Sequence, residues 1–192
     1  PFALEQGMQL CAGVLARPTV RARLSTKGAG KWVESTGDRS KFGLTTGEMV
    51  DTVEKLKHEG MLDCLQLLHF HIGSQITEIA PFVDSLVKVA DLIAKLRDHG
   101  FAIKYLDVGG GLGITYKDED PPVPRVFAEA MIAVIKDLGC TIVLEPGRVI
   151  VGNAGVLVTK VLYDKRTPAK HFIVVDAGMN DLIRPSLYGS FH

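Results

Sequence analysis

Apolar residues recur along this chain in short runs of strand length. Residues 65–70 form a nearly continuous apolar run, and residues 102–108 and 141–144 repeat the pattern farther along. An earlier strand is expected at residues 20–24. Strands that are apolar throughout are typical of sheets covered on both faces, so the pattern predicts a buried parallel sheet.

Segments in which apolar residues recur at helical spacing lie between these predicted strands. Thr45, with Glu48 three residues later, has the pattern of a capping box, and the helix that it begins should end at Gly60. Pro81 should open a second helix that ends before Gly100. A third helix is expected over residues 126–137. Strands that alternate with helices predict βαβ units.

The number of these units predicts part of a barrel. Four strands with their helices are about half of a (β/α)8 TIM barrel, whose usual size is about 250 residues, and the chain has 192. After residue 148 the rhythm changes, because residues 156–163 and 172–175 are β-rich with no helical pattern between them. We therefore predict an α/β fold. Residues 1–152 should form the C-terminal part of a barrel, and residues 153–192 linker strands and the beginning of a β domain.

Composition and charge describe an ordinary globular protein. Hydrophobic residues make up 46% of the chain, and 22 basic residues balance 22 acidic ones. The charges are scattered, so no nucleic-acid partner is expected. No apolar run approaches the ~20 residues of a membrane span, and the first residues have no signal-peptide pattern, so no membrane association is expected either.

The three cysteines carry no metal or disulfide pattern. Cys11, Cys64 and Cys140 are far apart and odd in number. They are expected to be small buried hydrophobic residues of a protein in the reducing cytoplasm.

Three polar, glycine-containing segments stand where predicted strands end. Their sequences are HFHIGSQ at residues 69–75, DVGGGLG at residues 107–113 and EPGR at residues 145–148. An imidazole can stack on a flat ring, a glycine run lets an anion approach backbone N–H groups, and an arginine fork gives charge-assisted hydrogen bonds. A nearby carboxylate could hold a ring nitrogen protonated. The segments therefore predict a site for a phosphate and a heteroaromatic ring.

In this order and spacing, the segments resemble the fold type III (alanine-racemase-like) pyridoxal-phosphate decarboxylases, most closely diaminopimelate decarboxylases. The resemblance runs from residue 41 to the end of the chain and includes GNAG at residues 152–155 and VDAGMNDLIRP at residues 175–185. It implies pyridoxal 5′-phosphate as cofactor, an amino-acid substrate and a homodimer in the full-length family. The implied reaction converts meso-diaminopimelate to L-lysine and CO2 in lysine biosynthesis.

The resemblance also implies roles for particular residues. His71 would stack on the cofactor ring, and Glu145 would accept the proton of the pyridinium nitrogen, which makes both catalytic. Ser74 would contact the phosphate, together with the N–H groups of Gly109, Gly110 and Gly111.

Three arginine and tyrosine positions complete the implied site. Gly147 and Arg148 would lie within reach of the phosphate or the substrate carboxylate. Arg184 and Tyr188 match positions that hold the distal carboxylate of the substrate, a bidentate task for which arginine is suited. On the residues alone, Arg184 and Tyr188 could be surface residues. Glu145 and Arg148 could instead have a helix-capping or surface ion-pair role, because Glu-Pro-Gly at the end of a strand also makes an ordinary turn.

Other functions are open for the histidines and the glycines. His69 and His71 are two apart on a predicted strand and share a face, as in some metal sites. Such a site needs further His and Asp ligands from other strands, and the remaining histidines do not converge, so no metal is expected. The histidines could also be structural core residues, and the glycine run only a tight turn. It does not fit the dinucleotide motif, because Ile114 occupies the third glycine position.

Two features depart from the family. Its Schiff-base lysine lies well over a hundred residues before the His-Ile-Gly-Ser motif, whereas only 70 residues precede His71, and Lys27, Lys31 and Lys41 stand in loop sequence. The cysteine-containing motif of the family's C-terminal domain is also absent. The chain is therefore expected to be an incomplete and inactive fragment, or a non-catalytic fragment that binds pyridoxal phosphate.

The upstream segment has a different resemblance. Residues 21–44 are more similar to biosynthetic arginine decarboxylase, whereas residues 2–7 resemble a distant part of diaminopimelate decarboxylase. The chain thus looks spliced, and arginine decarboxylation, a step toward polyamines, is the alternative activity.

Overall fold

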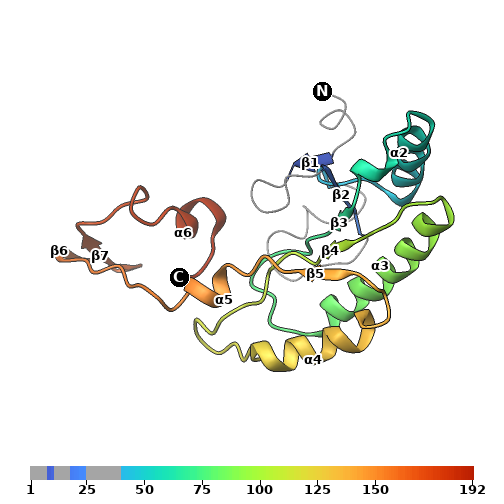
Figure 1. Cartoon of the computed structure of the whole chain (residues 1–192). Helices are drawn as coiled ribbons and strands as arrows, with labels where there is room; N and C mark the ends of the chain where they lie inside the picture. The colour runs from blue at the N-terminus through green and yellow to red at the C-terminus, as the bar shows by residue number, and fades with distance from the viewer. Residues whose placement is uncertain (1–7, 11–17, 25–39) are drawn as a thin grey trace.

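The structure, a computed structural model, describes residues 8–10, 18–24 and 40–192 (Figure 1). Its main sheet has the strand order β1-β2-β3-β4-β5. Strand β1 is antiparallel to β2, and all other neighbours are parallel, which confirms the predicted parallel sheet. The strands are β1 (Met8–Leu10), β2 (Pro18–Arg21), β3 (Leu67–His69), β4 (Tyr105–Asp107) and β5 (Thr141–Val143).

Strand β2 ends earlier than the predicted residues 20–24. Ala22 forms an isolated bridge with Leu44, and the Arg23 N–H donates to the Leu44 carbonyl at 2.8 Å. The Ala22 N–H still donates to the His69 carbonyl of β3, at 2.7 Å, so beyond Arg21 the chain bonds both to the sheet and to the segment that precedes the first helix.

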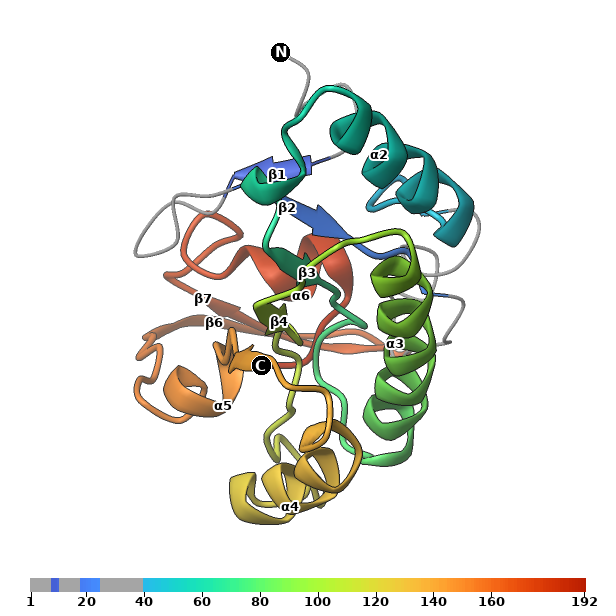
Figure 2. The ribbon, with the colours of Figure 1, turned by 45° about the vertical axis from the view of Figure 1, so that its right-hand side comes forward.

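The three predicted helices are α2 (Thr46–His58), α3 (Ala80–Asp98) and α4 (Pro124–Ile135). The capping box forms as expected, since the Glu48 N–H donates to Thr45 Oγ1 and the Thr45 N–H to Glu48 Oε2, at 3.3 and 2.7 Å. Gly60 follows α2 with a φ of 68°, a conformation that favours glycine. Figure 2 shows α2, α3 and α4 on one side of the sheet.

The core lies between these helices and one face of the sheet. Leu68 of β3 and Leu106 of β4 are fully buried there against Leu86 and Val89 of α3. Side chains alternate along a strand, so Leu67 and His69 face the opposite side, which is also buried. Both faces of the sheet are therefore covered at β3, as the apolar run predicts.

The core can be tested on α3 with neighbouring residues. Leu86→Ala should lower the free energy of unfolding by about 2–5 kcal/mol, because it leaves a cavity in the packed core. Val87 on the same helix is 49% exposed, so the control Val87→Ala should change stability by only about 0.5 kcal/mol. Urea unfolding of both variants measures the difference, and equal effects would contradict the assigned core.

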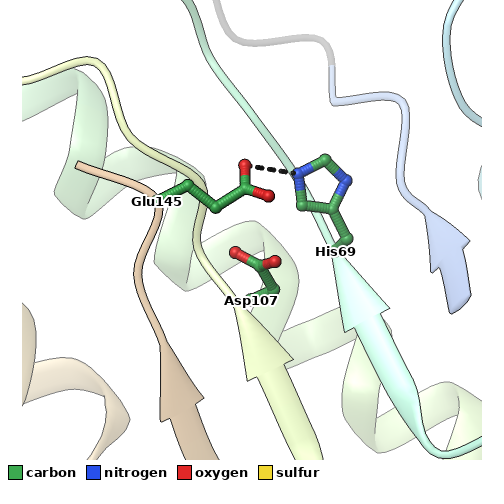
Figure 3. Close-up of side chains that lie close together, drawn as sticks. All are labelled: His69, Asp107 and Glu145. Atoms are coloured by element: carbon green, nitrogen blue, oxygen red, sulfur yellow. Dashed lines mark ion pairs between the residues drawn. The ribbon is translucent and has the colours of Figure 1, made fainter. Parts of the chain in front are cut away.

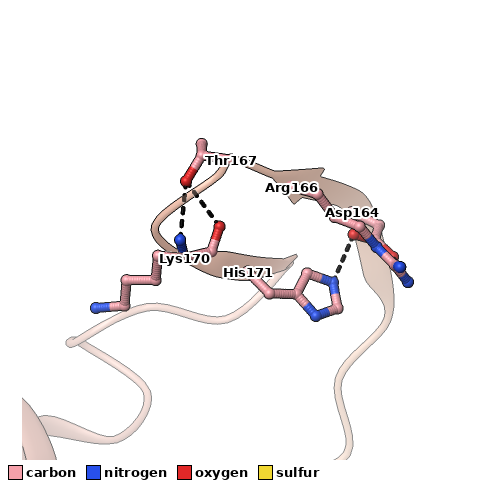
Figure 4. A network of polar contacts seen from close by, with 5 residues as sticks. All are labelled: Asp164, Arg166, Thr167, Lys170 and His171. Atoms are coloured by element: carbon pink, nitrogen blue, oxygen red, sulfur yellow. Dashed lines mark hydrogen bonds and ion pairs between the residues drawn. The ribbon is translucent and has the colours of Figure 1, made fainter.

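The remaining elements are α5 (Arg148–Val151), β6 (Val161–Arg166), β7 (His171–Val175) and α6 (Ile183–Tyr188). Strands β6 and β7 form a separate antiparallel hairpin, which begins later than the predicted residues 156–163. A polar network closes its turn: His171 Nε2 lies 2.6 Å from Asp164 Oδ1, and Thr167 Oγ1 accepts from the Lys170 N–H (Figure 4). The division between residues 152 and 153 stays a prediction.

The expectation for the cysteines is wrong for Cys64. This residue is exposed because it ends the surface 3-10 helix η2 (Leu62–Cys64), and Cys140 is half-buried. Cys11 lies outside the described residues, as do Lys27, Lys31, residues 2–7 and most of the loop before Ser40. None of the described helices is both long and apolar enough to span a membrane.

Candidate active site

Polar side chains gather where three neighbouring parallel strands end. His69 is the last residue of β3 and pairs in register with Asp107, the last residue of β4. Glu145 follows β5 by two residues, and its N–H donates to the Gly109 carbonyl at 2.8 Å. Figure 3 shows the three side chains pointing toward one another. The sheet topology thus builds one cluster from residues that are far apart in the sequence.

The cluster combines buried and accessible groups. His69 and Asp107 are buried, whereas the Glu145 side chain is 52% exposed. His69 Nε2 lies 3.5 Å from Glu145 Oε2, and neither ring nitrogen of His69 has a hydrogen bond within the described part of the chain. Asp107 Oδ1 accepts from the Gly109 N–H at 2.9 Å.

Burial sets the protonation of this cluster. It lowers the pKa of His69 to about 3, assisted by the charges of Arg21 and His71. Burial also raises the pKa of Asp107 to about 6; the Gly109 N–H opposes this shift, and Glu145 adds to it. The pKa of His71 is lowered by burial and by Arg21. At neutral pH, His69 is therefore an uncharged hydrogen-bonding group.

The glycine run brings the three strand-end loops into contact. Gly109 and Gly111 have φ values of 68° and 111°, which favour glycine. A Cβ atom on Gly110 would lie 2.2 Å from the Glu145 carbonyl oxygen, and one on Gly111 would lie 2.5 Å from the Gly73 carbonyl oxygen. Side chains at these positions would push the loops apart.

Two of the glycine N–H groups already have partners inside the protein. Gly109 donates to Asp107, and Gly110 donates to Nδ1 of His71 at 3.3 Å. The second bond requires Nδ1 to be an acceptor, so the proton of a neutral His71 is on Nε2. Of the three glycines predicted to bind an anion, Gly111 is therefore the one whose N–H group is left for this contact.

A cavity of about 190 Å³ lies beside this cluster and gathers four of the predicted site residues: Ser74, Arg148, Arg184 and Tyr188. The Arg148 guanidinium donates to Ser74 Oγ at 3.3 Å and to the Tyr116 hydroxyl. The Nε atoms of Arg148 and Arg184 are buried and have no hydrogen-bond partner among the described residues. Two guanidinium groups with unpaired donors make this cavity suited to an anionic ligand.

The other predicted residues lie next to this cavity. Glu145 and Gly147 belong to the loop that leads into Arg148, and a Cβ on Gly147 would meet nothing within 4 Å. His71 lies against Gly110, on the loop that continues to Ser74. Lys41 is exposed, with its Nζ 5.2 Å from the centre of the Phe42 ring. The structure thus brings the predicted residues into two adjoining groups and leaves Lys41 outside them.

Sequence analysis missed several residues of this region. Tyr116, Gln75 and Glu119 line the cavity, and Arg21 at the end of β2 adds charge near Glu145. Asp107 also belongs to this region, and its place just before the glycine run was a usable signal for it. For Tyr116 no such signal exists, because only the folded loop brings it to Arg148.

The donor atoms of His69, Asp107 and Glu145 all lie within 4.8 Å of one another, a geometry that was not anticipated. The sequence-based expectation of no metal rested on the histidines, whereas the groups that converge on His69 are carboxylates. Asp107 already accepts a hydrogen bond from Gly109, and the neighbouring cavity suits an anion. We therefore interpret the three residues as a cluster of polar side chains beside an anion site, and not as a metal site.

A phosphate-bearing ring fits this arrangement. The unpaired guanidinium donors suit a phosphate, and the open space at Gly147 leaves room beside them. The half-buried His71 offers a flat face, and the partly exposed Glu145 can reach a ring nitrogen from the sheet side. The donor set therefore matches an anionic heteroaromatic cofactor.

Comparisons with known proteins agree with this chemistry. The family model described as "Pyridoxal-dependent decarboxylase, pyridoxal binding domain" matches residues 4–152. Diaminopimelate decarboxylase from Aquifex aeolicus is 46% identical over 157 residues, which are 80% of this chain and 37% of that protein. The enzyme of the same name from Helicobacter pylori is 37% identical over 181 residues, or 94% of this chain and 44% of that protein.

Solved structures show the same similarity. Diaminopimelate decarboxylase from Helicobacter pylori in complex with L-lysine superposes with a TM-score of 0.81 at 33% identity, covering 99% of this chain and 46% of that one. The biosynthetic arginine decarboxylase from Campylobacter jejuni reaches 0.56 at 29% identity, covering 68% and 22%. The chain thus spans less than half the length of these relatives.

Proposed function

The chain belongs to the pyridoxal-dependent decarboxylases, and from this premise we propose that it serves the decarboxylation of meso-diaminopimelate to L-lysine and CO2. The observation that carries the proposal is the cavity that both Arg148 and Arg184 line. The similarity to diaminopimelate decarboxylases over most of the chain supports the same substrate. The parallel sheet would form part of a complete (β/α)8 barrel.

We assign the cofactor-binding residues from their places around the strand ends. His71 stacks on the ring, Glu145 pairs with the ring nitrogen, and Arg148 and Ser74 hold the phosphate with the N–H groups of Gly111 and Gly147. Pyridoxal phosphate, when bound, supplies an electron sink for the charge that remains as CO2 leaves. Glu145 holds the proton on the ring nitrogen that this task requires.

The charge of the cavity supports diaminopimelate over arginine. In this proposal Arg184 and Tyr188 hold the distal carboxylate, while Arg148 reaches the phosphate or the reacting end of the substrate. The distal guanidinium of an arginine substrate would instead meet the like charges of both arginines, which outnumber the carboxylate of Glu119 among the residues that line the cavity. Arginine decarboxylation stays the second candidate because of residues 21–44 and the similarity to that enzyme.

We further propose that the enzyme is a cytoplasmic homodimer. The free thiols of Cys64 and Cys140 support a reducing compartment. Apolar side chains are exposed along the hairpin, including Val161, Leu162 and Ile173, and such surfaces mark contact with another protein part. Either a further domain or a second subunit can cover them.

The substrate can be tested with a completed enzyme. We would join the chain to the remaining barrel strands of the Helicobacter pylori relative, which carry the family's lysine, and supply pyridoxal phosphate. CO2 release is expected from meso-diaminopimelate and not from arginine. The chain alone, treated identically, gives the background. Release from arginine only would overturn the choice of substrate, and borohydride trapping of cofactor on one lysine of the chain alone would contradict the expected lack of a covalent site.

A further inference from the structure

Gly109 bonds to the side chain of Asp107 and to the backbone of Glu145, the two acidic residues of the strand-end cluster. Its N–H donates to Asp107 Oδ1 at 2.9 Å, and its carbonyl accepts from the Glu145 N–H at 2.8 Å. A Cβ on Gly109 would lie 2.7 Å from His71 Nδ1, so only glycine fits at this position. One residue thus fixes where both acidic side chains begin, and they converge in Figure 3.

His69 approaches Glu145 from the other side. The His69 side chain is 8% exposed, and both ring nitrogens are unpaired among the described residues. Buried polar atoms without partners are uncommon, because leaving them unpaired destabilises the folded state. Nε2 is 3.5 Å from Glu145 Oε2, so a small movement of the accessible Glu145 side chain completes a hydrogen bond.

Charges on the neighbouring elements bear on the same cluster. Arg21 comes from β2, His71 from the loop after β3, and Glu145 from the loop after β5. Two adjacent carboxyl groups resist simultaneous ionisation and tend to share a proton. His69 is uncharged at neutral pH and keeps one N–H that it can donate.

We propose that Asp107 and His69 are positioning residues for Glu145: Asp107 forms with it a carboxyl pair that shares one proton, and neutral His69 donates from Nε2 to its carboxylate. The pair orients the Glu145 side chain. It carries one negative charge while it holds the shared proton and two once that proton is lost. The consequence for the cofactor, a more firmly protonated ring nitrogen, rests on the proposed function. The coupling among the three side chains does not.

Carboxyl carbon NMR of the chain itself tests the coupling. The Asp107 signal should titrate near pH 6 in the wild-type chain. In Glu145→Gln its midpoint should fall by about one pH unit, because the neighbouring negative charge is removed. The control Glu54→Gln, which removes a glutamate paired with His99 at 2.7 Å on the surface, should leave the midpoint unchanged. An unchanged midpoint in Glu145→Gln would overturn the proposal.

Imidazole nitrogen NMR tests the role of His69. At pH 7 the His69 ring should be neutral with its proton on Nε2. Glu145→Gln should alter the nitrogen signals of His69 and leave those of the control His99 unchanged. A proton on Nδ1, or a charged His69 at pH 7, would contradict the proposed donation.

Ligand binding separates this proposal from the proposed function. Pyridoxamine 5′-phosphate should bind more tightly than its analogue with carbon in place of the ring nitrogen, and Asp107→Asn should reduce that preference about tenfold. Asn keeps the acceptor for Gly109 and loses the charge. Coupled titrations without any preference for the ring nitrogen would support the carboxyl pair and refute the cofactor role of Glu145.

Discussion

Replacing Glu145 by glutamine in a completed enzyme should lower turnover by about 10²–10³-fold, while the fold and the bound cofactor stay largely intact. The amide has the shape of the carboxylate but not its charge, so the ring nitrogen loses the group that keeps it protonated. The Glu145 side chain is 52% exposed, so its loss should change stability by only about 0.5 kcal/mol. Turnover and melting temperature, measured on the same preparation, give both quantities.

The matched control is Glu129→Gln, at an exposed position of α4. It should leave turnover and melting temperature unchanged. Normal turnover in Glu145→Gln would remove Glu145 from the mechanism, and with it the main chemical reason to place the cofactor ring at the strand ends.

Arg148→Ala should weaken binding of the cofactor or the substrate by about 10- to 100-fold, the equivalent of one lost hydrogen bond to a charged group. Arg148 donates to Ser74 and Tyr116, so the change also releases both side chains at the cavity wall. Titration of the completed enzyme with pyridoxal phosphate, followed by substrate kinetics, shows which of the two ligands Arg148 holds.

Arg125→Ala, at an exposed position of α4, controls for the loss of positive charge at a distance from the cavity. If both variants bind cofactor and substrate alike, Arg148 is a surface residue of the turn. A large loss of stability in Arg148→Ala alone would instead assign it a structural task.

The pattern of apolar residues predicted the central sheet and its helices because the signals for these elements lie in neighbouring residues of the sequence. Thr45 and Glu48 carry the start of α2 in adjacent sequence, and the apolar runs of β3 and β4 need a buried sheet whatever surrounds them. Strand ends were less predictable. β2 ends at Arg21, and the next residue, Ala22, pairs with Leu44, a contact that no local pattern contains.

The site residues also differ in how well the sequence predicts them. Short motifs pointed to His71, Glu145 and Arg148 because their residue types and spacing recur in one family. Asp107 gains its role only from the carboxylate that the fold sets beside it, and Tyr116 from the guanidinium it meets. Such pairings follow from the sheet order and loop paths, so a sequence pattern cannot contain them.

The two walls of the cavity differ in their local stability against unfolding. Ser74 and Arg148 extend from loops that continue the packed strands, whereas Arg184 and Tyr188 stand on α6, a helix of six residues with none buried. Local opening costs least where few apolar contacts hold an element. The α6 wall should therefore undergo subglobal fluctuations that exchange its amide hydrogens long before β3 and β4 do. Affinity for a ligand held by Arg184 then includes the free energy of ordering this wall, so the two ends of the cavity respond differently to temperature.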